Sequence, residues 1–126
     1  MASMSQKRVL LVEDDKTMNM LLGKQLEKFG FAVTKGFSGR EALEAMSKEV
    51  FDAILLDLIL PEVDGFEVMQ KKGETKCAGV PFYVLTNLGS EDSLTRARAL
   101  GAKEVWVKTM VSPKDVIGKM KQDLAA

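Results

Sequence analysis

The stretch FDAILLDLILPEVDG, residues 51–65, decides the fold of the chain. Its apolar residues Ala53–Leu56 run without alternation into Asp57. Such a run is typical of a strand buried on both faces of a parallel sheet, and we expect this strand to span Phe51–Leu58. Asp57 then lies near the carboxyl end of a core strand, where open α/β sheets place their ligands. From the stretch alone, Asp57 could equally be a structural carboxylate that hydrogen-bonds the turn.

The rest of the chain alternates between strand patterns and helical patterns. Further strands are predicted at Val9–Val12, Phe31–Lys35, Pro81–Leu85 and Glu104–Val107. Apolar residues at helical spacing follow each strand, and Leu21 and Val50 belong to these stripes. The third helix is expected over about residues 65–72, with an irregular segment at residues 73–79. Residues suited to helix starts precede several of the stripes: Asp15, Asp64, Ser90 and Ser112. This alternation predicts right-handed βαβ crossovers. We therefore expect an α/β fold, a flavodoxin-like doubly wound parallel sheet of five strands in the order 2-1-3-4-5, with five helices on both faces.

The length and charge of the chain exclude several classes of protein. Its 126 residues fit a single domain, and 18 basic residues balance 18 acidic ones, so no global charge favours nucleic acid or an anionic membrane. No apolar run approaches the ~20 residues that span a bilayer. The first residues lack the pattern of a signal peptide. We expect residues 1–6 to be a disordered lead-in, residues 7–126 to form the domain, and the protein to be cytoplasmic.

Two residue types limit the chemistry that the chain can perform. It contains no histidine, which excludes histidine catalysis and histidine metal ligands. Cys77 is its only cysteine, which excludes an internal disulfide and a cysteine-built zinc site. Any proton transfer must therefore use carboxylates, lysine or water.

Polar side chains stand where four of the predicted strands end. Glu13 and Asp14 follow the first strand, Asp57 the third, Thr86 the fourth and Lys108 the fifth. Singly, each is most simply a cap, a turn residue or a surface charge. Together they favour a shared site, because the first and third strands of the expected order flank the crevice where ligands bind.

The combination of these groups points to phosphoryl chemistry. Glu13, Asp14 and Asp57 would repel one another without a cation, and an all-oxygen ligand set suits Mg²⁺. The ammonium of Lys108 and the hydroxyl of Thr86 add groups that stabilise a phosphoryl group in transfer. Asp57 is then the predicted nucleophile, which forms an aspartyl phosphate.

Four motifs carry a resemblance to a known family. They are VEDD at residues 12–15, DAILLDLILPEVDG at residues 52–65, VLT at residues 84–86 and GAKEVWVK at residues 101–108. In this order and spacing they resemble the response-regulator receiver domain of two-component signalling, including stand-alone receivers similar to the chemotaxis regulator. The similarity extends over about residues 7–124.

The resemblance implies a role for each site residue. Asp57 matches the phosphoacceptor, Thr86 the switch hydroxyl and Lys108 the lysine that pairs with a phosphoryl oxygen. The Mg²⁺ ligands implied are Asp14, Asp57, the backbone carbonyl of Ile59 and, through water, Glu13. No other cofactor is implied.

The resemblance also implies the function and the partners. The chain would take a phosphoryl group from a phosphohistidine on a sensor histidine kinase or a histidine phosphotransfer protein. It would hydrolyse the group slowly and switch its surface toward an unknown downstream protein. It would thus be autocatalytic rather than a turnover enzyme on a small molecule, a monomer or weak dimer, without direct nucleic-acid or membrane binding. The chain ends after the last predicted helix, so we expect a free-standing receiver or a domain cut from a longer protein.

Several positions depart from the family pattern. Thr109 stands where proline usually follows the lysine, so we expect a trans Lys108–Thr109 bond. Val105 replaces the usual aromatic residue coupled to the switch threonine. Trp106 is the next residue along the strand and should face the opposite way. The usual signal from threonine to aromatic residue is therefore expected to be weak or absent.

Three further departures concern access to the phosphoacceptor. Asn87 replaces a small residue and is expected to narrow the approach to Asp57. Ile59 and Leu88 flank the position of the hydrolytic water in this family, and both are apolar. We therefore expect a long-lived aspartyl phosphate.

Two alternatives of other classes stay open. One is a protein-interaction module of receiver fold that functions without phosphorylation, which the altered Val105 and Thr109 favour. The other is a Mg²⁺ phosphatase of the haloacid-dehalogenase type. Such enzymes need a second aspartate two residues after the nucleophile, where this chain has Ile59, so this alternative ranks lowest.

Overall fold

The computed structural model describes residues 6–125, so the lead-in expected for residues 1–6 falls, except for Gln6, outside the described residues. The strands are β1 (Arg8–Val12), β2 (Ala32–Gly36), β3 (Ala53–Leu56), β4 (Phe82–Thr86) and β5 (Ala102–Val107). The α-helices are α1 (Lys16–Lys28), α2 (Gly39–Lys48), α3 (Gly65–Gln70), α4 (Glu91–Ala99) and α5 (Pro113–Leu124). Two short 3₁₀ helices, η1 (Lys72–Glu74) and η2 (Lys108–Met110), complete the elements.

The five strands form one parallel sheet in the order β2-β1-β3-β4-β5, as the sequence predicted. The central strand β3 is buried along its whole length, and β1 is buried from Val9 onward. The more polar β2 lies at one edge of the sheet, where one side of a strand needs no partner.

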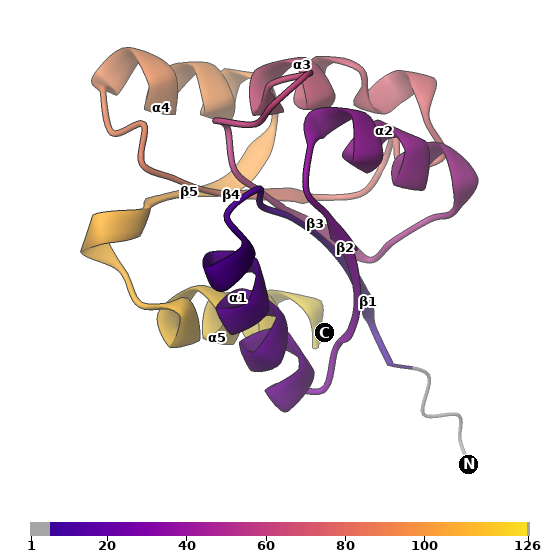
Figure 1. Ribbon diagram of the computed structural model, residues 1–126, viewed down its shortest axis with the longest axis vertical. Helices are drawn as coiled ribbons and strands as arrows, with labels where there is room; N and C mark the ends of the chain where they lie inside the picture. Colours follow the sequence, from indigo (N-terminus) through magenta and orange to yellow (C-terminus); the bar gives the residue numbers. More distant parts are fainter. Residues whose placement is uncertain (1–5, 126) are drawn as a thin grey trace.

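Helices cover both faces of the sheet. In Figure 1, α1 and α5 lie on one side of the sheet, and α2, α3 and α4 lie on the other. Alternate strand residues therefore enter two separate cores. Leu10, Ile54 and Val84 belong to the core under α2–α4, whereas Leu11, Leu55 and Tyr83 belong to the core under α1 and α5.

The predicted helix starts are confirmed by their caps. The side chain of Asp15 accepts a hydrogen bond from the Met18 backbone N–H, and that of Asp64 accepts one from Glu67. Ser112 caps α5 in the same way, with Pro113 as the first helical residue. These side chains satisfy N–H groups that the first turn of a helix leaves unpaired.

The structure corrects the sequence expectations for some element bounds and for the burial of two residues. The strand expected at Phe51–Leu58 is shorter, because only Ala53–Leu56 pairs in the ladder. The helix expected to reach Lys72 ends at Gln70, and η1 follows within a segment expected to be irregular. Val50 and Leu21, which were assigned to buried stripes, are 56% and 46% exposed.

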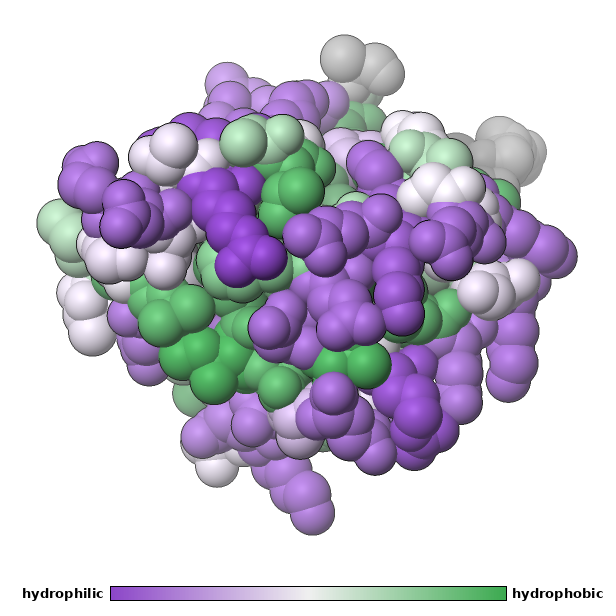
Figure 2. Space-filling view, turned by 90° about the horizontal axis from the view of Figure 1, so that it is seen from above, coloured by the Kyte–Doolittle hydropathy of each residue, from purple (hydrophilic) through white to green (hydrophobic). Residues whose placement is uncertain are grey.

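The surface is mainly hydrophilic but includes apolar side chains. Viewed from the side of α2–α4, a band of hydrophobic residues crosses a mostly hydrophilic face (Figure 2). Within the part of the chain that the structure describes, no helix is both long enough and apolar enough to cross a membrane.

One polar contact fastens α5 to the sheet. Tyr83, the only tyrosine of the chain, is fully buried, and its hydroxyl donates a hydrogen bond to Asp123 Oδ2 at 2.9 Å. Its ring stacks on Trp106, with the ring centroids 6.0 Å apart. Burial and the neighbouring Asp123 carboxylate raise the pKa of Tyr83 above its ordinary value.

This environment predicts a loss of stability in alkali. The unfolded chain releases the tyrosine proton near pH ~10, whereas the folded chain holds it, so the free energy of unfolding falls as the pH rises past that point. Tyrosinate absorbance should therefore appear near pH 10 in urea and only at higher pH in the native protein. A native titration with the same midpoint as the unfolded chain would contradict this, and Tyr83→Phe provides the blank.

Candidate phosphoacceptor and metal site

The pairing of β1 with β3 brings the two key carboxylates together. Val12 lies opposite Leu56 in the parallel register, and the Asp57 N–H donates to the Val12 carbonyl at 3.0 Å. Glu13 and Asp57, the next residues on each strand, therefore leave the sheet at the same point. Both are almost completely buried, at 2% and 5% exposed.

Asp14 completes a cluster of three carboxylates. One oxygen from each of Glu13, Asp14 and Asp57 lies within 4.8 Å of the others. Asp14 is exposed while the other two are buried, so the cluster opens to solvent on one side. Three hard oxygen donors with an open side fit a small divalent cation that keeps part of its water shell, which is the preference of Mg²⁺.

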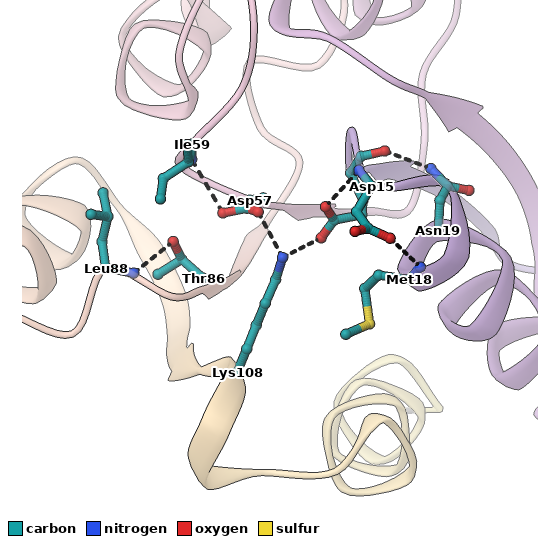
Figure 3. Close-up of polar contacts among 9 residues, drawn as sticks. Asp15, Met18, Asn19, Asp57, Ile59, Thr86, Leu88 and Lys108 are labelled. Atoms are coloured by element: carbon teal, nitrogen blue, oxygen red, sulfur yellow. Dashed lines mark hydrogen bonds and ion pairs between the residues drawn. The ribbon is translucent and has the colours of Figure 1, made fainter.

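Lys108 stands between the two buried carboxylates. Its Nζ lies 2.6 Å from Glu13 Oε1 and 2.8 Å from Asp57 Oδ2 (Figure 3). The side chain extends from the start of η2, directly after β5, and is only 11% exposed. One ammonium thus partly neutralises two buried carboxylates.

The pKa values follow from this balance. Burial raises the pKa of Glu13, and the hydrogen bonds from Lys108 and from the Asp15 N–H only partly oppose the rise. Burial alone would lower the pKa of Lys108, but its hydrogen bonds and ion pairs with Asp57 and Glu13 outweigh that cost and raise it. Lys108 is therefore held as an ammonium.

Asn19 supports the acidic loop and was missed by the sequence analysis. It is 1% exposed, and its Nδ2 donates to the Glu13 carbonyl at 2.9 Å (Figure 3). Asn19 is a polar residue on the buried face of α1, and this placement could have indicated its role from the sequence. Its amide holds the backbone from which both Glu13 and Asp14 project.

The loop after β3 turns sharply around Asp57. The Gly65 N–H donates to the Leu58 carbonyl at 2.9 Å, and the Ile59 N–H donates to Asp57 Oδ1 at 3.2 Å. A Cβ on Gly65 would lie 2.6 Å from Leu58 Cα, so only glycine allows α3 to begin this close to the strand. The side chain of Ile59 is 51% exposed.

Thr86 and Leu88 flank the same site from β4. Thr86 is the last residue of β4 and fully buried, and its hydroxyl oxygen accepts a hydrogen bond from the Leu88 N–H at 3.2 Å (Figure 3). The hydroxyl therefore rests on its own loop rather than on Asp57. Asn87, expected to narrow the approach to Asp57, is exposed.

The two departures on β5 have the expected geometry. Val105 packs with the core under α2–α4, on the same side as Val84, whereas Trp106 packs with the core under α1 and α5. Trp106 therefore does not take the place of an aromatic residue at position 105. The Lys108–Thr109 bond is trans, as expected, and no cis bond occurs among residues 6–125.

Comparison with known proteins decides the family. The model of the response regulator receiver domain matches residues 9–121. The chain belongs to the receiver-domain family. The transcriptional regulatory protein SrrA of Staphylococcus aureus is 34% identical over 113 residues, which cover 90% of this chain and 46% of SrrA. The receiver domain thus spans less than half the length of the curated relatives it matches.

Solved structures agree with this assignment. A CheY-like receiver domain from Methanospirillum hungatei covers 96% of this chain and 95% of its own, with a TM-score of 0.87 and 28% identity. The receiver domain of the sensor histidine kinase PA1611 from Pseudomonas aeruginosa, which contains magnesium in its active-site cleft, covers 97% of this chain and 100% of its own, with a TM-score of 0.85. At 21% identity the PA1611 likeness shows the fold alone.

The buried charge balance of the receiver domain predicts the effect of removing Lys108. Lys108→Gln leaves two buried carboxylates without their cation, so we expect a loss of about 3 kcal/mol in the free energy of unfolding, measured with urea in EDTA. Added Mg²⁺ should recover more stability in this variant than in the wild type. Lys103→Gln, which removes an exposed lysine, should change little. Equal losses in the two variants would contradict the role of burial.

Proposed function

We propose that this receiver domain accepts a phosphoryl group on Asp57 from a phosphohistidine donor and signals through the resulting change at its surface. The observation that carries the proposal is the position of Lys108. Its Nζ lies 2.8 Å from Asp57 Oδ2, and Asp57 forms a cluster of carboxylates with Glu13 and Asp14. A nucleophilic carboxylate, a fixed cation and an acidic cation site are the groups that in-line phosphoryl transfer needs.

The transfer step follows from the chemistry of the groups. An Asp57 carboxylate oxygen forms a bond to phosphorus while the bond from phosphorus to the donor nitrogen breaks, and the electron pair of that bond stays on the nitrogen. Lys108 is close enough to pair with a phosphoryl oxygen that carries negative charge. The N–H of Ile59, already 3.2 Å from Asp57 Oδ1, adds a donor on the other side of the carboxylate.

Glu13, Asp14, Asp57 and the backbone carbonyl of Ile59 would hold Mg²⁺ in this proposal. The three carboxylates supply a suitable donor set, with Glu13 acting through water. The bound ion would supply positive charge to the phosphoryl oxygens. Lys108 already forms ion pairs with two of these carboxylates, so part of its contact must be given up when the ion binds.

Thr86 would report the modification. Its hydroxyl now accepts a hydrogen bond from its own loop, and reorientation toward a phosphoryl oxygen would release the Leu88 N–H. Such a change biases a two-state equilibrium of the loop before α4 rather than building a new fold. The downstream protein would read this change on the surface of α4, β5 and α5.

A mass measurement tests the central claim. After incubation with acetyl phosphate and Mg²⁺, the intact protein should gain the mass of one phosphoryl group, and Asp57→Asn should gain none. EDTA should prevent the gain in the wild type. An unmodified, folded wild-type protein would instead favour an interaction module that functions without phosphorylation.

The lifetime of the modification is a separate prediction. Ile59 and Leu88 offer no side-chain donor or acceptor to orient an attacking water, so we expect the aspartyl phosphate to persist well beyond a minute at room temperature. Ile59→Asn introduces an amide at a half-exposed position and should shorten the lifetime. Loss of the wild-type phosphoryl group within a minute would overturn this prediction.

The control for this measurement is a variant of unchanged polarity. Ile59→Val keeps an apolar side chain at the same exposed place and should leave the lifetime unaltered. The decay is followed by mass after the phosphoryl donor is removed. If the asparagine and valine variants decay alike, water orientation at this position does not control the lifetime.

A further inference from the structure

The N-terminus of α2 presses against the loop that follows the phosphoacceptor strand. Gly39 is the first residue of α2 and is buried. A Cβ on Gly39 would lie 2.6 Å from the carbonyl carbon of Val63 and 2.8 Å from the Val63 Cβ, so no other residue fits without moving that backbone.

Two polar contacts reinforce the close approach. The Gly39 N–H donates to the Pro61 carbonyl at 3.4 Å, and Arg40 Nε donates to Glu62 Oε1 at 3.2 Å. Pro61, Glu62 and Val63 are thereby contacted one after another by two adjacent residues of α2. Their part of the loop is separated from Ile59 by a single residue, Leu60.

The held segment has an unfavourable backbone conformation. Glu62 has a φ of 70°, in the left-handed region that residues with a Cβ seldom adopt. The Val63 N–H donates back to the Pro61 carbonyl at 2.8 Å, which closes a γ-turn around Glu62. A turn of this kind persists when its surroundings fix it. Gly39 and Arg40 contact it here, and Val63 also packs against the core under α2–α4.

The same corner of the fold contacts the other acidic loop. The Glu13 N–H donates to the carbonyl of Gly36, the last residue of β2, at 3.1 Å. Residues 36–40 therefore contact both backbone segments that leave the sheet at the carboxylate cluster. Residues 36–40 make most of these contacts through their backbone. Such contacts are hard to predict from the pattern of side chains in the sequence.

We propose that Gly39 and Arg40 are positioning residues for the metal ion: they clamp Pro61–Val63 and thereby fix the backbone of Ile59 relative to Asp57. This inference rests on the proposed function, in which the Ile59 carbonyl is a ligand. A loop already held in its bound shape loses less conformational entropy on binding. Loosening the clamp should lower the favourable free energy of Mg²⁺ binding more than it lowers the free energy of unfolding.

Gly39→Ala is the direct test. Calorimetric titration of the unphosphorylated protein should show Mg²⁺ binding about ten-fold weaker, as for other groups that orient metal ligands. In phosphorylation by acetyl phosphate, the Mg²⁺ concentration for half-maximal rate should rise by a similar factor. The rate at saturating Mg²⁺ should change much less, because Asp57 and Lys108 are not displaced. A folded Gly39→Ala protein with wild-type Mg²⁺ affinity overturns the proposal.

Two controls separate positioning from general damage. Gly73→Ala adds the same methyl group to a glycine with open space around it and should leave Mg²⁺ binding unchanged. Val116→Ala truncates a fully buried residue in the opposite core and should lower stability without altering Mg²⁺ affinity. If Val116→Ala weakens Mg²⁺ binding as much as Gly39→Ala does, the clamp has no specific role.

Arg40→Gln keeps the proposal testable if Gly39→Ala fails to fold. The substitution removes the ion pair with Glu62. It also removes a positive charge from the protein, and this change alone favours the binding of Mg²⁺. We expect Mg²⁺ binding to weaken about two-fold in spite of this charge, the size of an exposed ion pair. Lys48→Gln makes the same charge change on α2 at a side chain that has no hydrogen bond or ion pair with residues 61–63, and it should not weaken Mg²⁺ binding. Unchanged or tighter binding in Arg40→Gln overturns the clamp.

The experiments also distinguish this inference from the function on which it rests. Asp14→Asn in an otherwise unaltered chain should greatly weaken Mg²⁺ binding. If the wild type itself binds no Mg²⁺, the proposed metal site is wrong, and so is the positioning role of Gly39 and Arg40. If the wild type binds Mg²⁺ and Asp14→Asn does not, but both α2 variants bind normally, only the clamp is wrong.

Discussion

The site depends on the parallel pairing of β1 with β3, which buries two carboxylates at one point of the sheet edge. The register sets Val12 opposite Leu56, so Glu13 and Asp57 must emerge together. Buried like charges at this separation are costly unless a cation accompanies them. Lys108 supplies that cation from the end of β5, with its Nζ within 3 Å of both side chains. The buried charges of Glu13, Asp57 and Lys108 cost stability, and they are also the groups that would take part in phosphoryl transfer.

Around the carboxylate cluster, the loops are held mainly by contacts to their backbone. Asn19 holds the carbonyl of Glu13, Gly65 allows α3 to begin against the end of β3, and Gly39 lets α2 touch the loop beyond it. None of these groups is a candidate ligand or nucleophile. Each restricts the place from which a candidate ligand projects, which is how a small domain can build a rigid site on loops.

Much of the fold could be predicted from the sequence, because unbroken apolar runs and helix caps are local signals. The convergence of Glu13, Asp14, Asp57 and Lys108 was expected from the flavodoxin-like strand order, and both the order and the convergence are present in the structure. Exact strand ends did not follow, since Phe51 and Leu58 are buried without pairing in the ladder. Leu21 and Val50 satisfied a helical pattern but face solvent, because periodicity does not define where a buried stripe stops. Asn19 and Gly39 act through contacts between distant segments, which no local pattern contains.

The opposite orientation of Val105 and Trp106 has a consequence for observing this molecule. By alternation along β4, Thr86 faces the same side as Val84, the layer of α2–α4, where Val105 also packs. The indole of Trp106 is instead stacked on Tyr83 in the layer of α5. The sheet thus lies between the proposed switch and the protein's only tryptophan. A change in tryptophan emission would mean that the disturbance had reached the side of the sheet that faces α5. Unchanged emission would mean that the surroundings of the indole had stayed as they were. Trp106 fluorescence therefore reports whether a change at Asp57 reaches the layer of α1 and α5.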